Sequence, residues 1–553
     1  MLTRLLRPSL LCVTSVLILG LGGGVGLASA AEAGAGAGAD RPNVVLIVAD
    51  DLAPNLCNFL PEGRGKSLTP NLDALAAAGV VLGNMHSPSP ICTPSRFAIL
   101  SGHYPSRAEN PEFARDTKQN DGQTAVAFNT HLLPEQSNLP KRLRAAGYAT
   151  GIVGKNHVID VPGFDRLSYR ARLEDPGVPE QLAENAEHLR AAFHEAGFDF
   201  AESLYWGNPD ADGIRQLAAH NQEWITDAAR RFIAEHRDGP FFLYMATTIP
   251  HGPFEDERSW KADPRITPEG MLEVVPDPQA PRETIPARLS EADVTGWNRE
   301  NVLWLDDAVG AVVQELEAQG VKENTLLIFL SDHGTEAKGS VYRRGTQTVA
   351  LMWRDGGFEV GPAVAQPLSL IDLAPTILAQ TGTDYEAEAF DGRDFTGVLE
   401  GREESLHDHL YFEVGYTRAV QKDGLKYLAV RYPQWAVDLT RQQRQERLDK
   451  LIVELEQRDR PVPTRDPMTP YSHLTIVPGG ADAEQVSIGK HPAFFDADQL
   501  YDLNEDPNEQ NNLIDDPAYA ERLSELKRLL EQEVASLPGH FAEFGRDAAT
   551  AGR

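Results

Sequence analysis

Long apolar runs recur along residues 41–400 and indicate strands that are buried on both faces. They cover 43–49, 148–153, 240–246 and 325–330. These runs lack the strict alternation of polar and apolar residues that marks a half-exposed strand. Strands with two buried faces are typical of parallel sheets that carry helices on each side.

Segments with apolar residues at helical spacing lie between these runs. The predicted helices cover 69–79, 139–146, 224–236 and 301–319. In the first of them, Thr69 and Pro70 are typical of a helix start and Gly79 of a helix end. Because strands and helices alternate, the sequence predicts a large α/β domain over 41–400, with a mostly parallel mixed sheet sandwiched by helices.

The pattern changes after about residue 401. Charged helical segments, a short strand at 427–430, turns rich in Asp, Asn and Pro, and a helix at 518–534 follow. We expect a smaller C-terminal α+β domain over 401–553, with a short antiparallel sheet. The segment 162–209 lacks clear periodicity in places and is predicted to be a substrate-facing insertion.

The N-terminus has the order of a secretory signal peptide. Two arginines precede an apolar run over 10–27, and a small-residue Ala-Ser-Ala sequence ends at residue 30. We therefore expect a signal peptide at 1–30, an Ala/Gly-rich linker at 31–40, and a secreted or periplasmic protein. A retained membrane anchor is the alternative, but glycines dilute the apolar run, so no stable membrane insertion is expected.

Composition narrows the possible partners. The chain of 553 residues carries a formal net charge of −31, which argues against nucleic acids and anionic membrane surfaces. An anionic substrate would need a local cluster of metal ion, Lys, Arg and His.

Of the three cysteines, Cys12 lies in the predicted signal peptide. Cys57 and Cys92 could form one disulfide, but a chain of this size with so few cysteines is not built on disulfides.

Acidic residues directly follow two of the predicted strands. Asp50 and Asp51 follow the first apolar run, and Asp332 and His333 follow the last. Carboxyl ends of neighbouring parallel strands form the ligand-binding edge of such sheets. Adjacent carboxylates need a cation or a shared proton, and several oxygen ligands suit Ca²⁺, or Mg²⁺ with water, better than zinc. Basic residues occupy the corresponding positions after the two middle strands, where Lys155, His157 and His251 lie.

The segment Cys92-Thr93-Pro94-Ser95-Arg96 fits no disulfide framework and no zinc-ligand spacing. A role for its thiol must therefore lie in reactivity or in chemical modification.

This segment, with Leu-Ser-Gly at 100–102, resembles the signature of formylglycine-dependent sulfatases of the alkaline phosphatase-like superfamily. In that family a formylglycine-generating maturation enzyme oxidises the cysteine to an aldehyde. The resemblance extends in order along residues 42–513. The other matching segments are 48–52, 69–79, 154–157, 250–254, 331–334, 338–345 and 500–513.

The resemblance implies an exported enzyme that hydrolyses a sulfate monoester. It implies a divalent metal ion, Ca²⁺ by family expectation, with five ligands: Asp50, Asp51, Asp332, His333 and formylglycine at position 92. Many relatives have Asn where this chain has His333, which leaves Mg²⁺ open. A hydrated aldehyde offers two hydroxyls on one carbon, one to attack sulfur and one to expel sulfate, whereas a serine or cysteine accomplishes only the first half easily.

The resemblance also implies roles for the remaining residues. Arg96, one helical turn after Cys92 if the helix starts near Pro94, and Lys155 would hold the diol and the metal side. His157 is the candidate base for the second step. His251 and Lys338 would contact the sulfate and protonate or stabilise the leaving alcohol, and Asp332 would assist deprotonation of the attacking hydroxyl.

Several alternatives stay open at this point. Arg343 and Arg344 depart from relatives that have an acid after the tyrosine, and they could serve an anionic substrate or only the surface. There are two competing functions. One is a phosphonate or phosphate ester hydrolase of the same superfamily, and the other, if Cys92 is unmodified, is a non-catalytic protein that binds sulfated glycans. Aryl, glycosaminoglycan, algal polysaccharide and choline sulfates are all possible substrates. The predicted export favours a sulfated carbohydrate.

Overall fold

The computed structural model describes residues 41–544, except 212, 458–461, 463, 471, 475–486 and 488. The predicted signal peptide and linker, 1–30 and 31–40, lie outside these residues. Among the residues described, no helix has both the length and the apolar character needed to cross a membrane.

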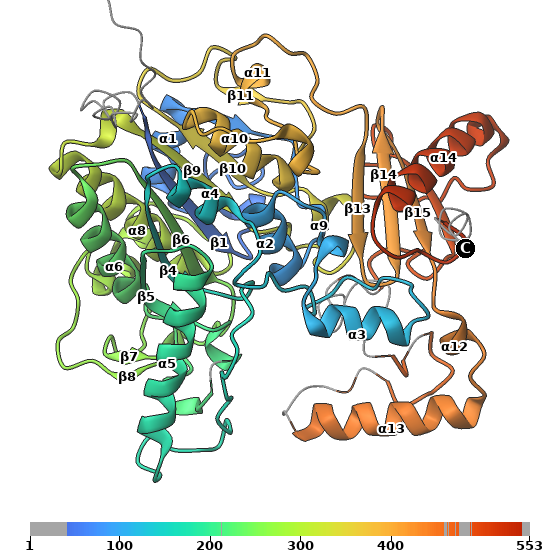
Figure 1. Ribbon diagram of the computed structural model, residues 1–553, viewed down its shortest axis with the longest axis horizontal. Coiled ribbons are helices and arrows are strands. Elements are labelled where there is room, and N and C mark those ends of the chain that lie inside the picture. Colours follow the sequence, from blue (N-terminus) through green and yellow to red (C-terminus); the bar gives the residue numbers. More distant parts are fainter. Residues whose placement is uncertain are drawn as a thin grey trace, which may run out of the picture. The chain divides into compact units, whose positions relative to one another are not determined.

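An eight-stranded mixed sheet forms the centre of the fold. Its strands, in spatial order, are β11 (Ala363–Val364), β2 (Val80–Leu82), β10 (Ala350–Trp353), β9 (Thr325–Ser331), β1 (Asn43–Asp50), β6 (Phe241–Pro250), β4 (Ala149–Lys155) and β5 (Phe200–Tyr205) (Figure 1). The five strands from β9 to β5 are parallel to one another, whereas β10 is antiparallel to both its neighbours. The mostly parallel mixed sheet predicted from the sequence is therefore confirmed.

Helices cover both faces of this sheet, which explains why the strands are apolar without interruption. Alternate residues of β1 belong to two separate cores, Val44, Leu46 and Val48 to one and Val45 and Ile47 to the other. The first core is closed by α2 (Cys92–Ser101), α4 (Leu139–Ala145), α5 (Val178–Glu195) and α10 (Leu373–Gln380). The second is closed by α1 (Pro70–Ala78), α6 (Gln222–His236), α7 (Ile285–Glu291) and α8 (Arg299–Ala318). Each fully buried Val or Leu contributes about 1.5–3 kcal/mol to this arrangement.

The prediction of an insertion at 162–209 is wrong for most of that segment. Strand β5 pairs in parallel with β4, and α5 packs Leu189 and Phe193 into the first core. The buried positions of α5 recur at helical spacing, but Ala186, Ala192 and the hydrogen-bonded Asn185 occupy part of that face. Small and polar residues on that face reduce the apolar periodicity on which the prediction depends.

A second sheet lies in the C-terminal part of the chain. It is antiparallel and contains β13 (Leu410–Val414), β14 (Thr417–Lys422), β15 (Leu425–Val430) and β16 (Asp498–Asp502) (Figure 1). On one face, Leu526, Leu529 and Leu530 of α14 (Ala520–Ser536) pack against it. Its other face shares a core with Ile91 and Ala337, next to Cys92 and Lys338. The predicted antiparallel sheet is confirmed, and it supports the two segments that carry these residues.

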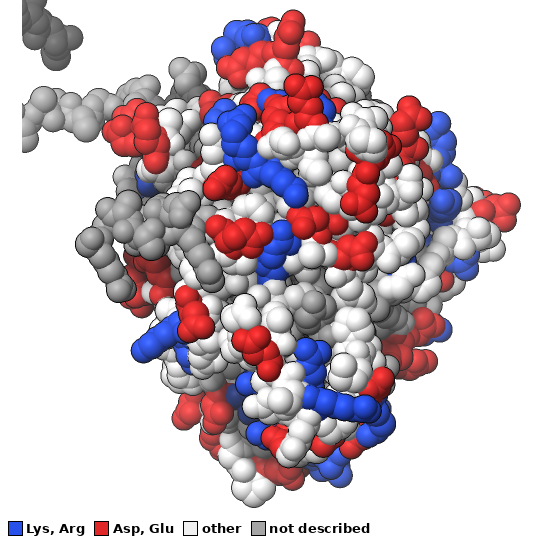
Figure 2. Space-filling view, turned by 90° about the vertical axis from the view of Figure 1, so that its right-hand side faces the viewer, with Lys and Arg blue, Asp and Glu red and all other residues white. Residues whose placement is uncertain are grey.

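The shorter elements connect these layers. They are β3 (Met85–His86), α3 (Pro111–Gln119), β7 (Ile266–Thr267), β8 (Gly270–Met271), α9 (Arg343–Thr346), β12 (Leu368–Ser369), α11 (Thr396–Leu399), α12 (Gln434–Val437) and α13 (Arg441–Gln457). Figure 2 views the molecule from the right-hand side of Figure 1, and on that face Lys and Arg side chains are interspersed with Asp and Glu.

Candidate active site

The parallel strands deliver the predicted site residues to one edge of the sheet. Ala49 of β1 lies opposite Ser331 of β9, so the acidic residues that follow both strands lie at the same level. Asp50 also lies opposite Pro250, the last residue of β6, which places His251 beside them. Lys155 ends β4 on the far side of β6. Convergence at the carboxyl edge follows directly from the parallel register.

Cys92 is the first residue of α2 and is 1% exposed. The helix therefore begins two residues earlier than the predicted start near Pro94. Proline is tolerated in the first helical turn because the backbone N–H groups there have no partner within the helix. Arg96 lies four residues after Cys92, on the same face of the helix, so both side chains reach the edge of the sheet.

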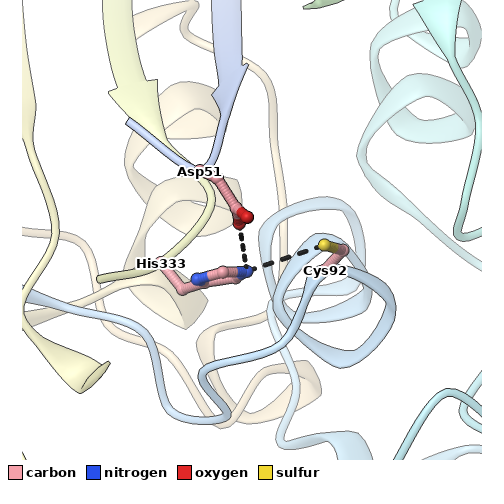
Figure 3. Close-up of side chains that lie close together, drawn as sticks. All are labelled: Asp51, Cys92 and His333. Atoms are coloured by element: carbon pink, nitrogen blue, oxygen red, sulfur yellow. Dashed lines mark hydrogen bonds and ion pairs between the residues drawn. The ribbon is translucent and has the colours of Figure 1, made fainter. Parts of the chain in front are cut away.

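The sulfur of Cys92 contacts both acidic strand ends. Its Sγ lies 3.5 Å from Asp50 Oδ1, 3.6 Å from His333 Nε2 and 3.7 Å from Lys338 Nζ. Figure 3 shows Asp51 and Cys92 on the same side of the His333 ring, directed at Nε2. Ligand atoms of Asp51, Cys92 and His333 lie within 4.8 Å of one another, as do those of Asp50, Cys92 and Asp332.

The inner part of the site is a closed network of ion pairs. Lys155 Nζ lies 2.6 Å from Asp50 Oδ2, and Arg96 Nη2 lies 3.4 Å from Asp50 Oδ1 and 3.2 Å from Asp332 Oδ2. These four side chains have no exposed surface. Burial by itself would raise the pKa of Asp50, but Lys155, with His251 and Arg96, holds it well below its usual range.

The outer part of the site is partly open to solvent. Lys338 Nζ lies 2.8 Å from both carboxylate oxygens of Asp51. His333 Nε2 lies 3.3 Å from Asp51 Oδ1, and His251 Nε2 lies 3.6 Å from Asp51 Oδ2. The side chains of Asp51, His251 and Lys338 are 18%, 24% and 10% exposed. Burial opposes ionisation of Asp51, but Lys338 and the two histidines lower its pKa to about 2.

The donor set fits a divalent metal ion. Asp50, Asp51 and Asp332 offer hard carboxylate oxygens, as Ca²⁺ and Mg²⁺ prefer. His333 Nδ1 lies 2.9 Å from the carbonyl oxygen of Gly334, so Nδ1 carries the proton and Nε2 keeps its lone pair for a ligand. These residues would hold the ion, which when bound would neutralise charge on a substrate anion.

Cys92 in its unmodified form is a poor nucleophile. Burial raises the pKa of its thiol far above the usual range, although Lys155 and Lys338 act in the opposite direction. The thiolate is the reactive form of cysteine, and it is not populated here at neutral pH.

His157 is placed differently from the other predicted residues. Its backbone has φ of 51°, and its ring stacks on Phe128 with centroids 5.5 Å apart. Nδ1 is buried and has no hydrogen-bond partner among the described residues. The structure thus brings nine of the ten predicted residues into one contact network, whereas no described hydrogen bond or ion pair joins His157 to it.

Two further residues contact this network and were not predicted. Asn208 Nδ2 lies 3.1 Å from His251 Nε2, and the Tyr244 hydroxyl lies 3.5 Å from Arg96 Nη1. Asn208 follows β5 by three residues, so recognition of that strand would have placed it at the same edge. Tyr244 lies inside β6 and carries no sequence signal of its own.

The two arginines that depart from the resemblance contact other parts of the chain. Arg343 donates from Nε to Gln347 Oε1 at 3.0 Å, and its backbone N–H donates to Glu509. Arg344 pairs with Glu336 and donates to Asn508 Oδ1 at 3.0 Å. Neither side chain has a described contact with the residues around Cys92.

Comparison with known proteins gives consistent results. A family model described as Sulfatase matches residues 42–383. An ulvan-active sulfatase of Formosa agariphila is 25% identical over 520 residues, which cover 90% of this chain and 75% of that protein. Human arylsulfatase A is 27% identical over 415 residues, which cover 69% of this chain and 72% of that protein.

The fold is also shared with solved structures. One of these structures contains its substrate, D-glucosamine-2-N,6-O-disulfate. It superposes with a TM-score of 0.54 at 16% identity, and the match covers 89% of this chain and 97% of that chain. At this level of identity the likeness concerns the fold.

Proposed function

The chain belongs to the sulfatase family of the alkaline phosphatase-like superfamily and is a sulfuric ester hydrolase, and from this premise we propose that it releases sulfate from a sulfated carbohydrate with formylglycine at position 92 and one divalent metal ion. The observation that carries the proposal is the position of Cys92. Its sulfur contacts Asp50, His333 and Lys338 at once, so an oxygen nucleophile attached to the same Cβ would face both the metal ligands and a cation.

The inner residues would position the reacting groups. Arg96 and Lys155 hold Asp50 and Asp332 through ion pairs of 2.6–3.4 Å, so these carboxylates keep one orientation toward a Ca²⁺ ion. Preorganised groups of this kind need no rearrangement as charge develops in the reaction. Mg²⁺ with water is the alternative for the same donor set.

The outer residues would meet the substrate. Lys338 and His251 lie on the exposed side of Asp51, where a sulfate ester can reach them. Lys338 would pair with a sulfate oxygen, and His251 would donate a proton to the oxygen of the leaving alcohol. His157 is proposed as the base of the second step. Since its ring has no described hydrogen bond to the network, a water molecule would have to lie between them.

A carbohydrate is the proposed alcohol because relatives act on such compounds. One relative is described as ulvan-active, and a solved structure of the same fold holds a disulfated glucosamine as its substrate. Export to a secreted or periplasmic location, proposed from the N-terminal sequence alone, would bring the enzyme to extracellular glycans.

The proposal needs a maturation enzyme as partner. Conversion of Cys92 breaks the Cβ–S bond and releases sulfur as sulfide, takes the aldehyde oxygen from water, and passes two electrons and two protons to an acceptor used by that enzyme. Because Cys92 is 1% exposed in the folded chain, the maturation enzyme would have to act before folding is complete.

Two measurements test the proposed function. Mass spectrometry of the peptide that contains residue 92 should find the aldehyde in protein produced with a formylglycine-generating enzyme, and the thiol in protein produced without one. The first preparation should hydrolyse an aryl sulfate much faster than the matching aryl phosphate, and a chelator should abolish this activity until Ca²⁺ is restored. A persistent thiol in active protein would refute the formylglycine chemistry. Preference for the phosphate would favour a phosphate ester hydrolase.

A further inference from the structure

Two aromatic side chains are unusually exposed beside the outer part of the site. Phe254 is 50% exposed and Trp297 is 64% exposed. Their ring centroids lie 4.9 Å apart, with the planes at 62°, which is the edge-to-face arrangement that aromatic pairs favour. Large aromatic residues are usually mostly buried, so a contacting pair left in solvent marks a candidate binding surface.

Phe254 lies on the segment that carries His251, and the residue after Trp297 is hydrogen-bonded to that segment. Phe254 follows His251 by three residues, and three residues span at most about 10 Å. The Phe254 ring lies over Gly252, where an added Cβ would come within 3.2 Å of the ring. Asn298, next to Trp297, donates from Nδ2 to the carbonyl oxygen of Pro250 at 2.7 Å. The pair is therefore held at a fixed place near the His251 ring.

The site is open to solvent on the side of Asp51 and His251. Asp50, Arg96 and Lys155 have no exposed side-chain surface, whereas Asp51 and His251 are 18% and 24% exposed. A substrate would therefore reach the site from the side of Asp51 and His251, and the part of the molecule beyond the sulfate could extend toward Phe254, three residues after His251.

A buried polar atom of Asn208, which has no partner among the described residues, lies on a side chain that contacts His251. Asn208 Oδ1 is buried and has no hydrogen-bond partner among the described residues, although its Nδ2 contacts His251. Buried polar atoms are nearly always hydrogen-bonded, so this oxygen lacks a donor that a ligand hydroxyl could supply.

We propose that Phe254 and Trp297 form a stacking platform for the sugar ring that carries the sulfate ester, with Asn208 Oδ1 accepting a hydrogen bond from one of its hydroxyls. This inference rests on the proposed function, because it assumes that the leaving alcohol is a carbohydrate. A pyranose presents an apolar C–H face to an aromatic ring and hydroxyls along its edge, which matches one aromatic pair and one acceptor. A compact quaternary ammonium would instead need an enclosing aromatic cage.

The aromatic group around Trp206 is less available for stacking. Trp206 stacks on Phe164, with centroids 5.3 Å apart, and the guanidinium of Arg166 lies 4.4 Å from the same ring. These neighbours cover the Trp206 ring with protein, whereas most of the Trp297 surface faces solvent.

Binding in a Cys92→Ala background tests the platform without turnover. Calorimetry would use N-acetylgalactosamine 6-sulfate and ulvan oligosaccharides as probes. Phe254→Ala and Trp297→Ala should each weaken binding of at least one probe roughly tenfold, the loss expected for one aromatic contact. Val437→Ala is the matched control, because Val437 is 53% exposed on α12, which Figure 1 shows apart from the ends of β1 and β9. Unchanged affinity in both variants, or no binding of either probe to the Cys92→Ala protein, would overturn the platform.

Steady-state kinetics of the protein with formylglycine at position 92 would show which kind of leaving alcohol the aromatic pair binds. kcat/KM would be measured for a sulfated sugar, an aryl sulfate and a short alkyl sulfate. The two substitutions should reduce kcat/KM most for the sugar, mainly through KM. A loss confined to the aryl sulfate would show that the pair binds aryl groups and would overturn the sugar assignment. An enzyme that hydrolyses none of the three esters would refute the proposed function, whereas the binding measurement would still decide the platform.

Discussion

The inner and outer parts of the site contain the same kinds of charged group in different surroundings. Asp50 pairs with Lys155 where neither side chain has exposed surface, whereas Asp51 pairs with Lys338 where both are partly exposed. The two ion pairs have similar lengths, 2.6 and 2.8 Å. The two ion pairs differ in their access to water. The buried pair can only hold the site together, whereas the partly exposed pair can meet a substrate.

Physical chemistry gives the two parts different sensitivities. A buried carboxylate that loses its partner stays desolvated and uncompensated, which is strongly destabilising. A partly exposed carboxylate that loses its partner can be hydrated instead. Substitutions in the inner part should therefore reduce stability, and substitutions in the outer part should reduce activity with little loss of stability.

The largest effect is expected at Cys92, where the two parts meet. Cys92→Ala removes the side chain from which the proposed aldehyde would be made, so kcat for sulfate release should fall at least about 10⁴-fold. The free energy of unfolding should change by about 1 kcal/mol, because the lost group is small. Sulfate release and urea unfolding measure the two quantities. Retention of even a hundredth of the activity would show that residue 92 is not the nucleophile.

The second prediction compares the inner and outer parts of the site directly, with one lysine substitution in each. Lys155→Met leaves Asp50 buried without its 2.6 Å partner and should reduce the free energy of unfolding by about 3–5 kcal/mol. Lys338→Met should cost only about 1 kcal/mol, because Asp51 is 18% exposed and keeps two histidine neighbours. Both variants would be measured by urea unfolding in the presence of a chelator.

A surface lysine provides the control for this pair. Lys422 Nζ lies 2.8 Å from Asp408, which is 69% exposed, so Lys422→Met should change the free energy of unfolding by less than about 1 kcal/mol. Equal destabilisation by Lys155→Met and Lys338→Met would contradict the distinction between the two parts of the site.

Much of the fold and of the inner site could be predicted from the sequence. The buried strands are continuous apolar runs, and charged residues at the ends of parallel strands must converge, so the meeting of Asp50 with Asp332 follows from local patterns. The unpredicted residues beside the outer part depend on contacts that no local pattern encodes. Phe254 and Trp297 meet across more than forty residues of chain, and Asn208 follows a strand, β5, that lies in the segment predicted to be an insertion.

The third prediction concerns proton transfer in the outer part. His251→Gln keeps a polar side chain of similar length but cannot deliver a proton, so kcat should fall about 10²- to 10³-fold for sulfate esters of sugars. Esters of acidic phenols should lose less, because their leaving oxygen needs less protonation. His236→Gln on α6, where the ring Nδ1 bonds to the Phe232 carbonyl oxygen, is the control and should retain activity. Equal losses for sugar and phenol esters would exclude His251 as the proton donor.

The smallest effect is expected at His157, which belongs clearly to neither part. His157→Phe preserves stacking on Phe128 but removes both ring nitrogens, and kcat should fall about tenfold. This lies below the range of about 10²- to 10⁴-fold for general acid–base groups, because neither nitrogen has a described hydrogen bond to the network and water would have to transmit the proton. Steady-state rates with a sugar sulfate measure the effect, and unfolding should change by less than about 1 kcal/mol. A thousandfold loss would place His157 in direct contact with the reacting groups, and unchanged kcat would remove it from the reaction.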